Sequence, residues 1–208
     1  VAMVCRRLFP KYKIKIKVSV CKSYFVKFQH GDPDMTEEDF NKIKKAMKKA
    51  VNDDLLINKI TIPTEEAIKI FKKQGMMDKV TILQYRKEET IDIYECEGYY
   101  DYLYGSLVNR TGLLNKYELV MYRPGFLLRY PRADSNGQIP KFEDEPAFRR
   151  FLTQATEWSR DSKTEYISDT NEKVRNNKSE EFINMAEEKF ASQMDDLIQR
   201  IMKHIKNI

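Results

Sequence analysis

Polar and apolar residues alternate from Lys11 to Val20, where lysines stand between tyrosine, isoleucine and valine. A period of two exposes one face of a β-strand and buries the other, so we predict a strand with one buried face here. Runs of β-branched and aromatic residues predict further strands. They lie at Ser23 to Phe28, Val80 to Tyr85, Ile91 to Cys96, Tyr117 to Tyr122 and Phe126 to Tyr130.

Apolar residues at helical spacing predict two helices in the first half of the chain. Thr36, followed three positions later by Asp39, is a capping arrangement for the first helix. Thr64 is the expected N-cap of the second helix, and Gly75 is its expected stop. The apolar faces are Phe40, Ile43, Met47 and Val51 in the first helix, and Ala67, Ile68 and Phe71 in the second.

The order of these elements indicates the fold class. Strands and helices mix without a regular βαβ rhythm, which favours an α+β domain with a largely antiparallel sheet packed with helices. After Pro131 the strand signals cease, and a polar stretch contains Asp-Ser-Asn-Gly at residues 134–137. We therefore predict a domain over residues 1–131, a linker over residues 132–143 and a helical C-terminal extension over residues 144–208.

Two amphipathic helices are expected in the extension. The first spans Pro146 to Arg160 and is expected to bury Phe148, Phe151, Leu152, Ala155 and Trp158. The second is long and begins at Ser179, with Phe182, Ala186, Phe190, Leu197, Ile201 and Ile205 aligned. These faces require a partner surface, in this chain or in another.

Composition and charge indicate the expected location and partners of the protein. Residues 1–80 carry 18 basic and 10 acidic side chains, so positive charge gathers at the front and could attract RNA or a phosphorylated ligand. No run approaches the about 20 apolar residues of a membrane helix, so we expect no membrane partner. Three widely spaced cysteines suit a reducing compartment, and a cytoplasmic location is expected.

The sequence lacks the common catalytic motifs. The seven glycines form neither a phosphate-binding loop nor a dinucleotide-binding motif. His30 and His204 have no second ligand at zinc spacing, and His30 is expected to be a solvated turn residue. Five tyrosines gather between Tyr94 and Gly105, where they form either a ligand cleft or a half-buried sheet edge. Asp101 is the main polar candidate there.

Several segments resemble the second domain shared by threonyl- and alanyl-tRNA synthetases. Residues 36–51 resemble its first helix after the hairpin, and residues 64–75 resemble the next helix. Ser-Tyr-Phe-Val-Lys-Phe at residues 23–28 stands where the synthetases usually have Gly-Phe-Tyr-Tyr-Asp-Phe. Residues 101–111 align with the stretch that contains Asp-Leu-Cys-Arg-Gly-Pro-His. The resemblance covers about residues 1–130 and implies the fold of that domain.

The resemblance implies an editing cleft whose reactive groups are missing. Relatives that remove a wrongly attached amino acid from tRNA use a His-x-x-x-His pair with a later cysteine and histidine. Here Met3 stands at the second histidine, Leu103 at the cysteine and Leu107 at the later histidine. Leucine offers no lone pair for a metal or a proton, and the methionine thioether is at best a weak acceptor, so hydrolysis of aminoacyl-tRNA by this apparatus is not expected. We expect no catalytic residue and no metal, and a ligand cleft at Met3, Tyr24, Asp101, Leu103 and Leu107.

Residues 105–112, 117–119 and 122–131 resemble the version of this region that precedes the kinase domain in uridine-kinase-family proteins. This resemblance implies a non-catalytic accessory region, used for ligand binding or dimerisation, of an ATP-dependent nucleoside kinase. The kinase domain is then expected after Ile208. ATP and Mg²⁺ would belong to that domain, and no cofactor is expected in this chain. The implied partners are the kinase domain, a second copy, and a nucleoside or amino acid.

Two alternatives stay open at this point. An RNA- or tRNA-binding remnant of an editing domain is supported by the basic front half and by Tyr24, Phe25 and Phe28 among lysines. A hydrolase with a different constellation would use Asp101, Cys96 and Tyr104, and it requires turnover of aminoacyl-tRNA.

Overall fold

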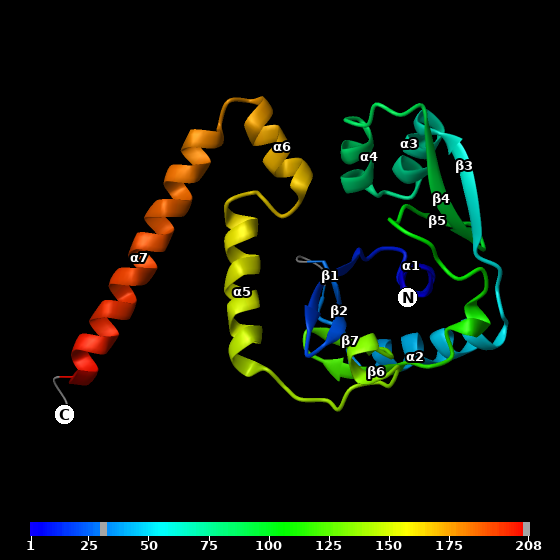
Figure 1. Cartoon of the computed structure of the whole chain (residues 1–208), viewed down its shortest axis with the longest axis horizontal. Helices are drawn as coiled ribbons and strands as arrows, with labels where there is room; N and C mark the ends of the chain where they lie inside the picture. The colour runs from blue at the N-terminus through cyan, green and yellow to red at the C-terminus, as the bar shows by residue number, and fades with distance from the viewer. Residues whose placement is uncertain (30–32, 206–208) are drawn as a thin grey trace. The chain divides into compact units, whose positions relative to one another are not determined.

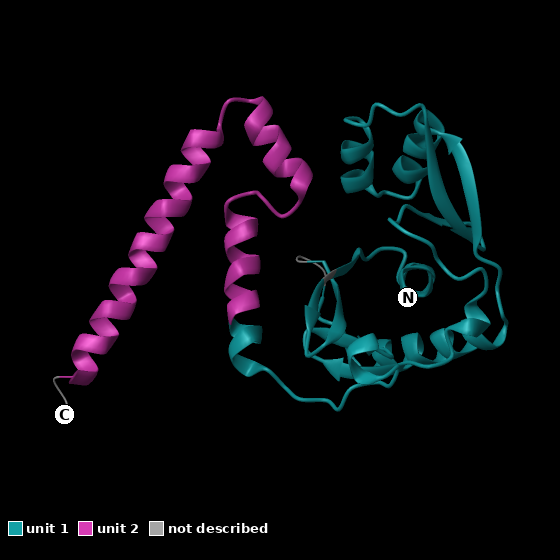
Figure 2. Cartoon of the chain, in the orientation of Figure 1, with its two compact units in different colours: residues 1–150 teal, residues 151–208 magenta. Residues whose placement is uncertain are grey.

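The computed structural model describes residues 1–29 and 33–205, except for the side chain of Lys17. These residues form two compact units, Val1–Arg150 and Phe151–Ile208, coloured teal and magenta in Figure 2. The boundaries predicted at residues 131 and 143 stay predictions. His30 lies outside the described residues.

The first unit contains two antiparallel sheets (Figure 1). The four-stranded sheet has the order β1 (Ile14–Val20), β2 (Ser23–Phe28), β7 (Gly125–Arg129), β6 (Glu118–Tyr122). The three-stranded sheet has the order β3 (Asn58–Pro63), β4 (Thr90–Cys96), β5 (Tyr99–Asp101). All their pairings are antiparallel. The α+β prediction is confirmed, and the strands are divided between two sheets.

Of the four described helices that lie wholly in this unit, only α2 begins with a side-chain cap. They are α1 (Ala2–Leu8), α2 (Glu37–Asn52), α3 (Thr64–Lys73) and α4 (Met77–Leu83), with short 3₁₀ turns at Thr111–Leu113 and Ala133–Ser135. The capping box predicted for α2 is confirmed, because Thr36 and Asp39 each accept a hydrogen bond from the other's backbone N–H at 3.1 Å. Thr64, however, is not an N-cap. Pro63 holds that position, and the Thr64 hydroxyl donates to the Glu88 carbonyl at 2.7 Å.

Helices α1 and α2 share a core with the four-stranded sheet. The buried residues are Met3, Val4 and Cys5 of α1, Phe40, Ile43 and Met47 of α2, and Val26, Phe28 and Phe126 of the strands. Strands β2 and β7 approach closely at Gly125, where a Cβ atom would lie 2.0 Å from the Val26 carbonyl oxygen. Only glycine permits that approach.

The alternation predicted for the first strand holds only in part. The register between β1 and β2 shifts between Ile16 and Val18, as in a β-bulge. A one-residue shift turns side chains to the opposite face. Ile16 is accordingly 39% exposed, so the prediction that every alternate apolar residue is buried is wrong there.

Helices α3 and α4 cover the three-stranded sheet around a second core. Its buried residues are Ala67, Phe71, Val80, Leu83, Ile91 and Ile93. The strand predicted at Val80 to Tyr85 is wrong, because residues 77–83 form α4. Val80 and Leu83 are three positions apart, so both face this core from one side of a helix. The structure adds α1, β3 and β5, which the sequence pattern did not predict.

The second unit contains helices alone among its described residues. Helix α5 (Pro146–Asp161) begins in the first unit and is followed by α6 (Ile167–Arg175) and α7 (Ser179–Ile205). The predicted helix bounds are close to those of α5 and α7. The burial predicted for α5 is not observed, because none of its residues is buried and Phe151 is 61% exposed. Within residues 1–29 and 33–205, no helix is both long and apolar enough to cross a membrane.

Candidate functional site

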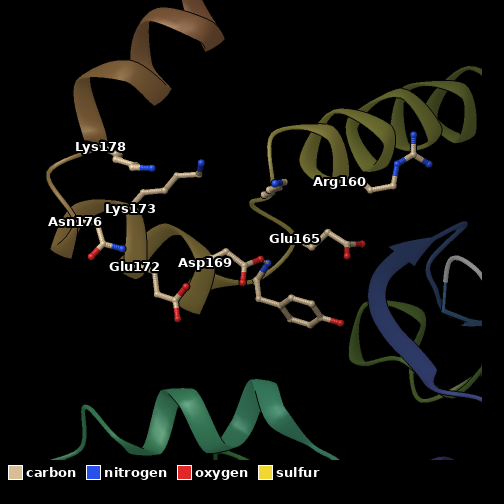
Figure 3. A pocket seen from close by; sticks show the side chains of 9 residues that line it. Arg160, Glu165, Asp169, Glu172, Lys173, Asn176 and Lys178 are labelled. Carbon is tan, nitrogen blue, oxygen red and sulfur yellow. Dashed lines mark hydrogen bonds between the residues drawn. The ribbon is translucent and has the colours of Figure 1, made fainter.

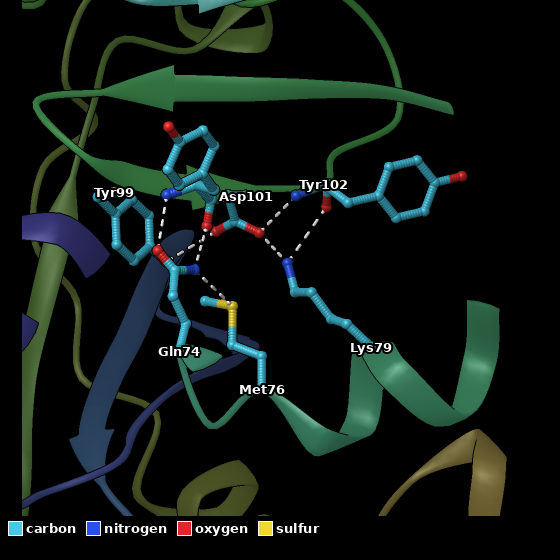
Figure 4. Close-up of polar contacts among 7 residues, drawn as sticks. Gln74, Met76, Lys79, Tyr99, Asp101 and Tyr102 are labelled. Carbon is cyan, nitrogen blue, oxygen red and sulfur yellow. Dashed lines mark hydrogen bonds and ion pairs between the residues drawn. The ribbon is translucent and has the colours of Figure 1, made fainter. Parts of the chain in front are cut away.

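Asp101 lies at the centre of a polar cluster on edge strand β5 (Figure 4). Its carboxylate accepts hydrogen bonds from the Tyr99 hydroxyl at 2.9 Å and from the backbone N–H of Tyr102 at 2.7 Å. The ammonium group of Lys79, from α4, forms an ion pair with the same carboxylate and also reaches the Tyr102 carbonyl at 3.3 Å. The side chains of Lys79 and Asp101 are only 20% and 18% exposed. Three donors therefore hold one half-sheltered carboxylate.

Gln74 ties this cluster to the end of α3. Its side-chain amide donates to the Tyr100 carbonyl at 2.8 Å and accepts from the Tyr100 N–H at 2.9 Å, so it pairs with β5 as a neighbouring strand would. The guanidinium of Arg6, from α1, donates to the backbone carbonyl of Gln74. Helix α1 is thereby joined to the cluster, although Arg6 and Gln74 lie 68 positions apart.

Burial sets the protonation of two groups in the cluster. It lowers the pKa of the Lys79 ammonium to about 8; Arg6 adds to this shift and Asp78 opposes it. Burial also raises the pKa of the Tyr99 hydroxyl to about 12, against the effect of Arg6. Tyr99 is therefore a neutral hydrogen-bond donor near neutral pH. Lys79 is a cation that loses its proton far more easily than an exposed lysine.

The loop of residues 102–110 leaves this cluster and is anchored at its middle and at its far end. The Tyr94 hydroxyl donates to the Gly105 carbonyl at 2.8 Å and accepts from the Leu107 N–H at 3.3 Å. At the far end, Asp54 accepts from Arg110 at 2.6 Å and from the Gly112 N–H at 3.0 Å. Exposed apolar side chains on the loop are Leu103, Tyr104, Leu107 and Val108.

The predicted cleft residues do not all meet. Asp101 is in the cluster, and Leu103 and Leu107 lie on the adjoining loop, 43% and 42% exposed. Met3 is buried in the core of the four-stranded sheet. Tyr24 is exposed on β2, where its ring stacks on that of Tyr130 with centroids 5.0 Å apart. No described contact joins Met3 or Tyr24 to Asp101.

The cluster contains residues that the sequence analysis missed. Lys79, Tyr99, Gln74 and Arg6 come from α4, β5 and the ends of α3 and α1, so no short motif signals them. The tyrosines follow the period of two along β5. Tyr99 packs on the first core, whereas Tyr100 and Tyr102 pack on the second. Tyr99 and Tyr100 therefore form part of the sheet edge, whereas Tyr94 lies on the central strand β4 and Tyr102 and Tyr104 lie on the loop.

The alternative hydrolase constellation does not assemble. Cys96 is buried in the first core, and burial raises the pKa of its thiol, which makes it a poor nucleophile. Tyr104 is 89% exposed and its ring contacts Tyr102, with centroids 5.2 Å apart. Tyr99, and not Tyr104, donates to Asp101. In the described part of the chain, no three His, Cys, Asp or Glu side chains gather as a metal site would require.

The second unit has a cavity of about 490 Å³ beside α6 (Figure 3). Four cationic side chains line it, from Arg160, Lys163, Lys173 and Lys178, and three acidic ones, from Glu165, Asp169 and Glu172. The Asp169 carboxylate accepts a hydrogen bond from the Tyr166 N–H at 2.8 Å, which caps the first turn of α6. The two signs of charge nearly balance, so we assign this cavity no ligand.

Comparison with known proteins finds similarity to threonine–tRNA ligases over most of the chain. No protein-family profile matches the chain. It is 30% identical over 139 residues to the threonine–tRNA ligase of Coxiella burnetii, and 31% identical over 140 residues to that of Halalkalibacterium halodurans. With the threonine–tRNA ligase of Desulfovibrio desulfuricans it shares 27% identity over 165 residues. The chain contains a threonyl-tRNA synthetase-like region.

The synthetase-like region is a small part of those relatives. The three alignments cover 66%, 66% and 76% of this chain, but 21%, 21% and 25% of the ligases. The chain thus spans about a fifth to a quarter of the length of these relatives. The resemblance to threonyl-tRNA synthetases is confirmed. These relatives are ligases, so the link to uridine kinases stays a prediction.

Proposed function

We propose that the synthetase-like region binds the single-stranded 3′ end of a tRNA-like RNA and does not hydrolyse what that end carries. The relatives are ligases that act on tRNA, and this supports RNA as the ligand class. The observation that carries the proposal is the cluster at Asp101, which stands beside a loop without a reactive group. Residues 102–110 contain no histidine, cysteine or carboxylate.

The surroundings of the cluster suit a nucleic-acid end. Arg6, Lys79 and the exposed pair Lys72 and Lys73, in the last turn of α3, place cations near the cluster that can attract phosphate. Tyr104 offers an almost fully exposed ring on which a base can stack. The exposed leucines of the loop add apolar surface for an unstacked base or an attached side chain.

Hydrolysis is not part of the proposal. It would require a general base or a metal-bound water near the scissile ester. The Asp101 carboxylate is already held by three donors. The resemblance to editing domains implies that Leu103 and Leu107 take the places of a cysteine and a histidine. Binding without turnover follows.

The test is fluorescence anisotropy with a labelled hairpin that mimics a tRNA acceptor stem. We expect tighter binding when the hairpin ends in single-stranded CCA than when it is blunt, and weaker binding as salt rises. Lys79→Met combined with Asp101→Asn is expected to reduce affinity about tenfold. Lys45→Met, on the exposed face of α2, is the matched control and is expected to have little effect.

Equal affinity for the blunt and CCA-ended hairpins would contradict the proposal, because it indicates attraction by charge alone. Release of the amino acid from an aminoacylated tRNA would contradict the non-hydrolytic part. Binding of a nucleoside or a free amino acid without RNA would instead support the accessory role expected from the uridine-kinase resemblance. That role gains no support from the ligase relatives.

A further inference from the structure

Seven apolar residues of α7 follow an eleven-residue repeat. Their successive spacings are 3, 4 and 4, and the series is Ile183, Ala186, Phe190, Met194, Leu197, Ile201 and Ile205. Eleven residues in three turns give 3.67 residues per turn, close to the 3.6 of a straight α-helix. These side chains therefore form a nearly straight stripe from Ile183 to Ile205.

This stripe is open to solvent. Phe190 is 65% exposed, Leu197 49% and Ile205 59%, and none of the residues of α7 is buried. The stripe runs from Ile183 to Ile205, which is about 33 Å at 1.5 Å of rise per residue. An uncovered apolar stripe of this length favours association with another surface.

The charges beside the stripe indicate what covers it. One flank carries Lys189 and Arg200, which are eleven residues apart. The other flank carries Glu180, Glu187 and Asp195. When two parallel helices are related by a two-fold axis along their length, the basic flank of each faces the acidic flank of the other. In an antiparallel pair, the basic flanks face each other and so do the acidic flanks.

A parallel, in-register pair also matches the charges along the axis. Glu187 of one helix falls two residues from Lys189 of the other. Two residues are about 3 Å of rise, which these side chains span readily. The helix is thus complementary to a parallel copy of itself in both its apolar stripe and its flanking charges.

We propose that α7 pairs with α7 of a second copy of this chain as a parallel two-helix coil through the eleven-residue stripe. The proposal is independent of RNA binding by the first unit, and either can fail alone. It extends the expectation of a homodimer by naming the surface and the orientation.

The first test is sedimentation equilibrium of the 208-residue chain. We expect a dimer, and Leu197→Glu should weaken it roughly a hundredfold, because it places a charge in the apolar seam. Ser192→Glu, on the opposite side of α7, is the matched control and should leave the dimer intact. A monomeric wild-type chain, or a dimer unaffected by Leu197→Glu, would overturn the proposal.

Orientation is tested separately. Ile183→Cys, near the start of α7, should form a disulfide between two copies under mild oxidation only if the helices are parallel. Lys189→Glu should weaken the dimer, and adding Glu187→Lys should restore it, since both contacts are then reversed together. A dimer in which the Ile183→Cys variant forms no cross-link, or in which this rescue fails, would overturn the parallel arrangement.

Discussion

The hydroxyl of Tyr94 donates a hydrogen bond to the backbone carbonyl of Gly105 at 2.8 Å. Tyr94 lies on the central strand β4, and Gly105 lies on the loop that carries Leu103 and Leu107. The same hydroxyl accepts from the Leu107 N–H at 3.3 Å. One buried side chain therefore holds the middle of the loop against the sheet.

Tyr94→Phe tests this anchor. The variant keeps the ring but loses both hydrogen bonds, so we expect the free energy of unfolding to fall by about 1 kcal/mol. Faster hydrogen exchange is expected over residues 103–108. Tyr85→Phe, which removes a hydroxyl from a 44% exposed ring, is the control. Equal exchange in the two variants would show that Tyr94 does not hold the loop.

The ion pair between Lys79 and Asp101 predicts a marked asymmetry between single and double substitutions. Asp101→Ala leaves the sheltered Lys79 ammonium without its partner. We therefore expect the free energy of unfolding, measured by urea denaturation, to fall by about 3 kcal/mol. Lys79→Met combined with Asp101→Ala removes both charges and should cost less than the sum of the Lys79→Met and Asp101→Ala losses. Additive losses in this double-mutant cycle would show that the two groups do not interact.

The lowered pKa of Lys79 predicts how RNA binding depends on pH. The ammonium is protonated below about pH 8 and neutral above it, whereas exposed lysines stay charged to higher pH. Affinity for the CCA-ended hairpin should therefore fall as pH rises from about 7 to about 9. Lys79→Arg keeps its charge across this range and should remove most of the fall. An unchanged pH profile in Lys79→Arg would exclude Lys79 as the titrating group.

The capping box of α2 predicts a simple stability effect. Thr36→Ala removes the side chain that accepts from the Asp39 N–H, so the free energy of unfolding should fall by about 1 kcal/mol. Asp39→Ala breaks the same box from the other side. Because the two hydrogen bonds are reciprocal, the double variant should lose less free energy of unfolding than the sum of the two single losses, as measured by thermal unfolding.

Sequence patterns alone were sufficient where structure depends on near neighbours. The start of α2 at Thr36, the end of α3 before Gly75 and the strand over Ile91 to Cys96 were all predicted. Capping, a glycine with positive φ and a run of β-branched residues act within a few positions of one another. The long helix from Ser179 follows from periodicity for the same reason.

Tertiary packing decided what local patterns leave open. Val80 has a β-branched side chain that favours a strand, yet burial of Val80 and Leu83 against the second core makes that segment a helix. The site depends still more on distant contacts. Asp101 alone was foreseen, because Lys79 is 22 positions away and Gln74 reaches β5 across 26. The spacing of residues along the sequence does not reveal such pairs, because α1, α3 and α4 meet at edge strand β5 only in the folded chain.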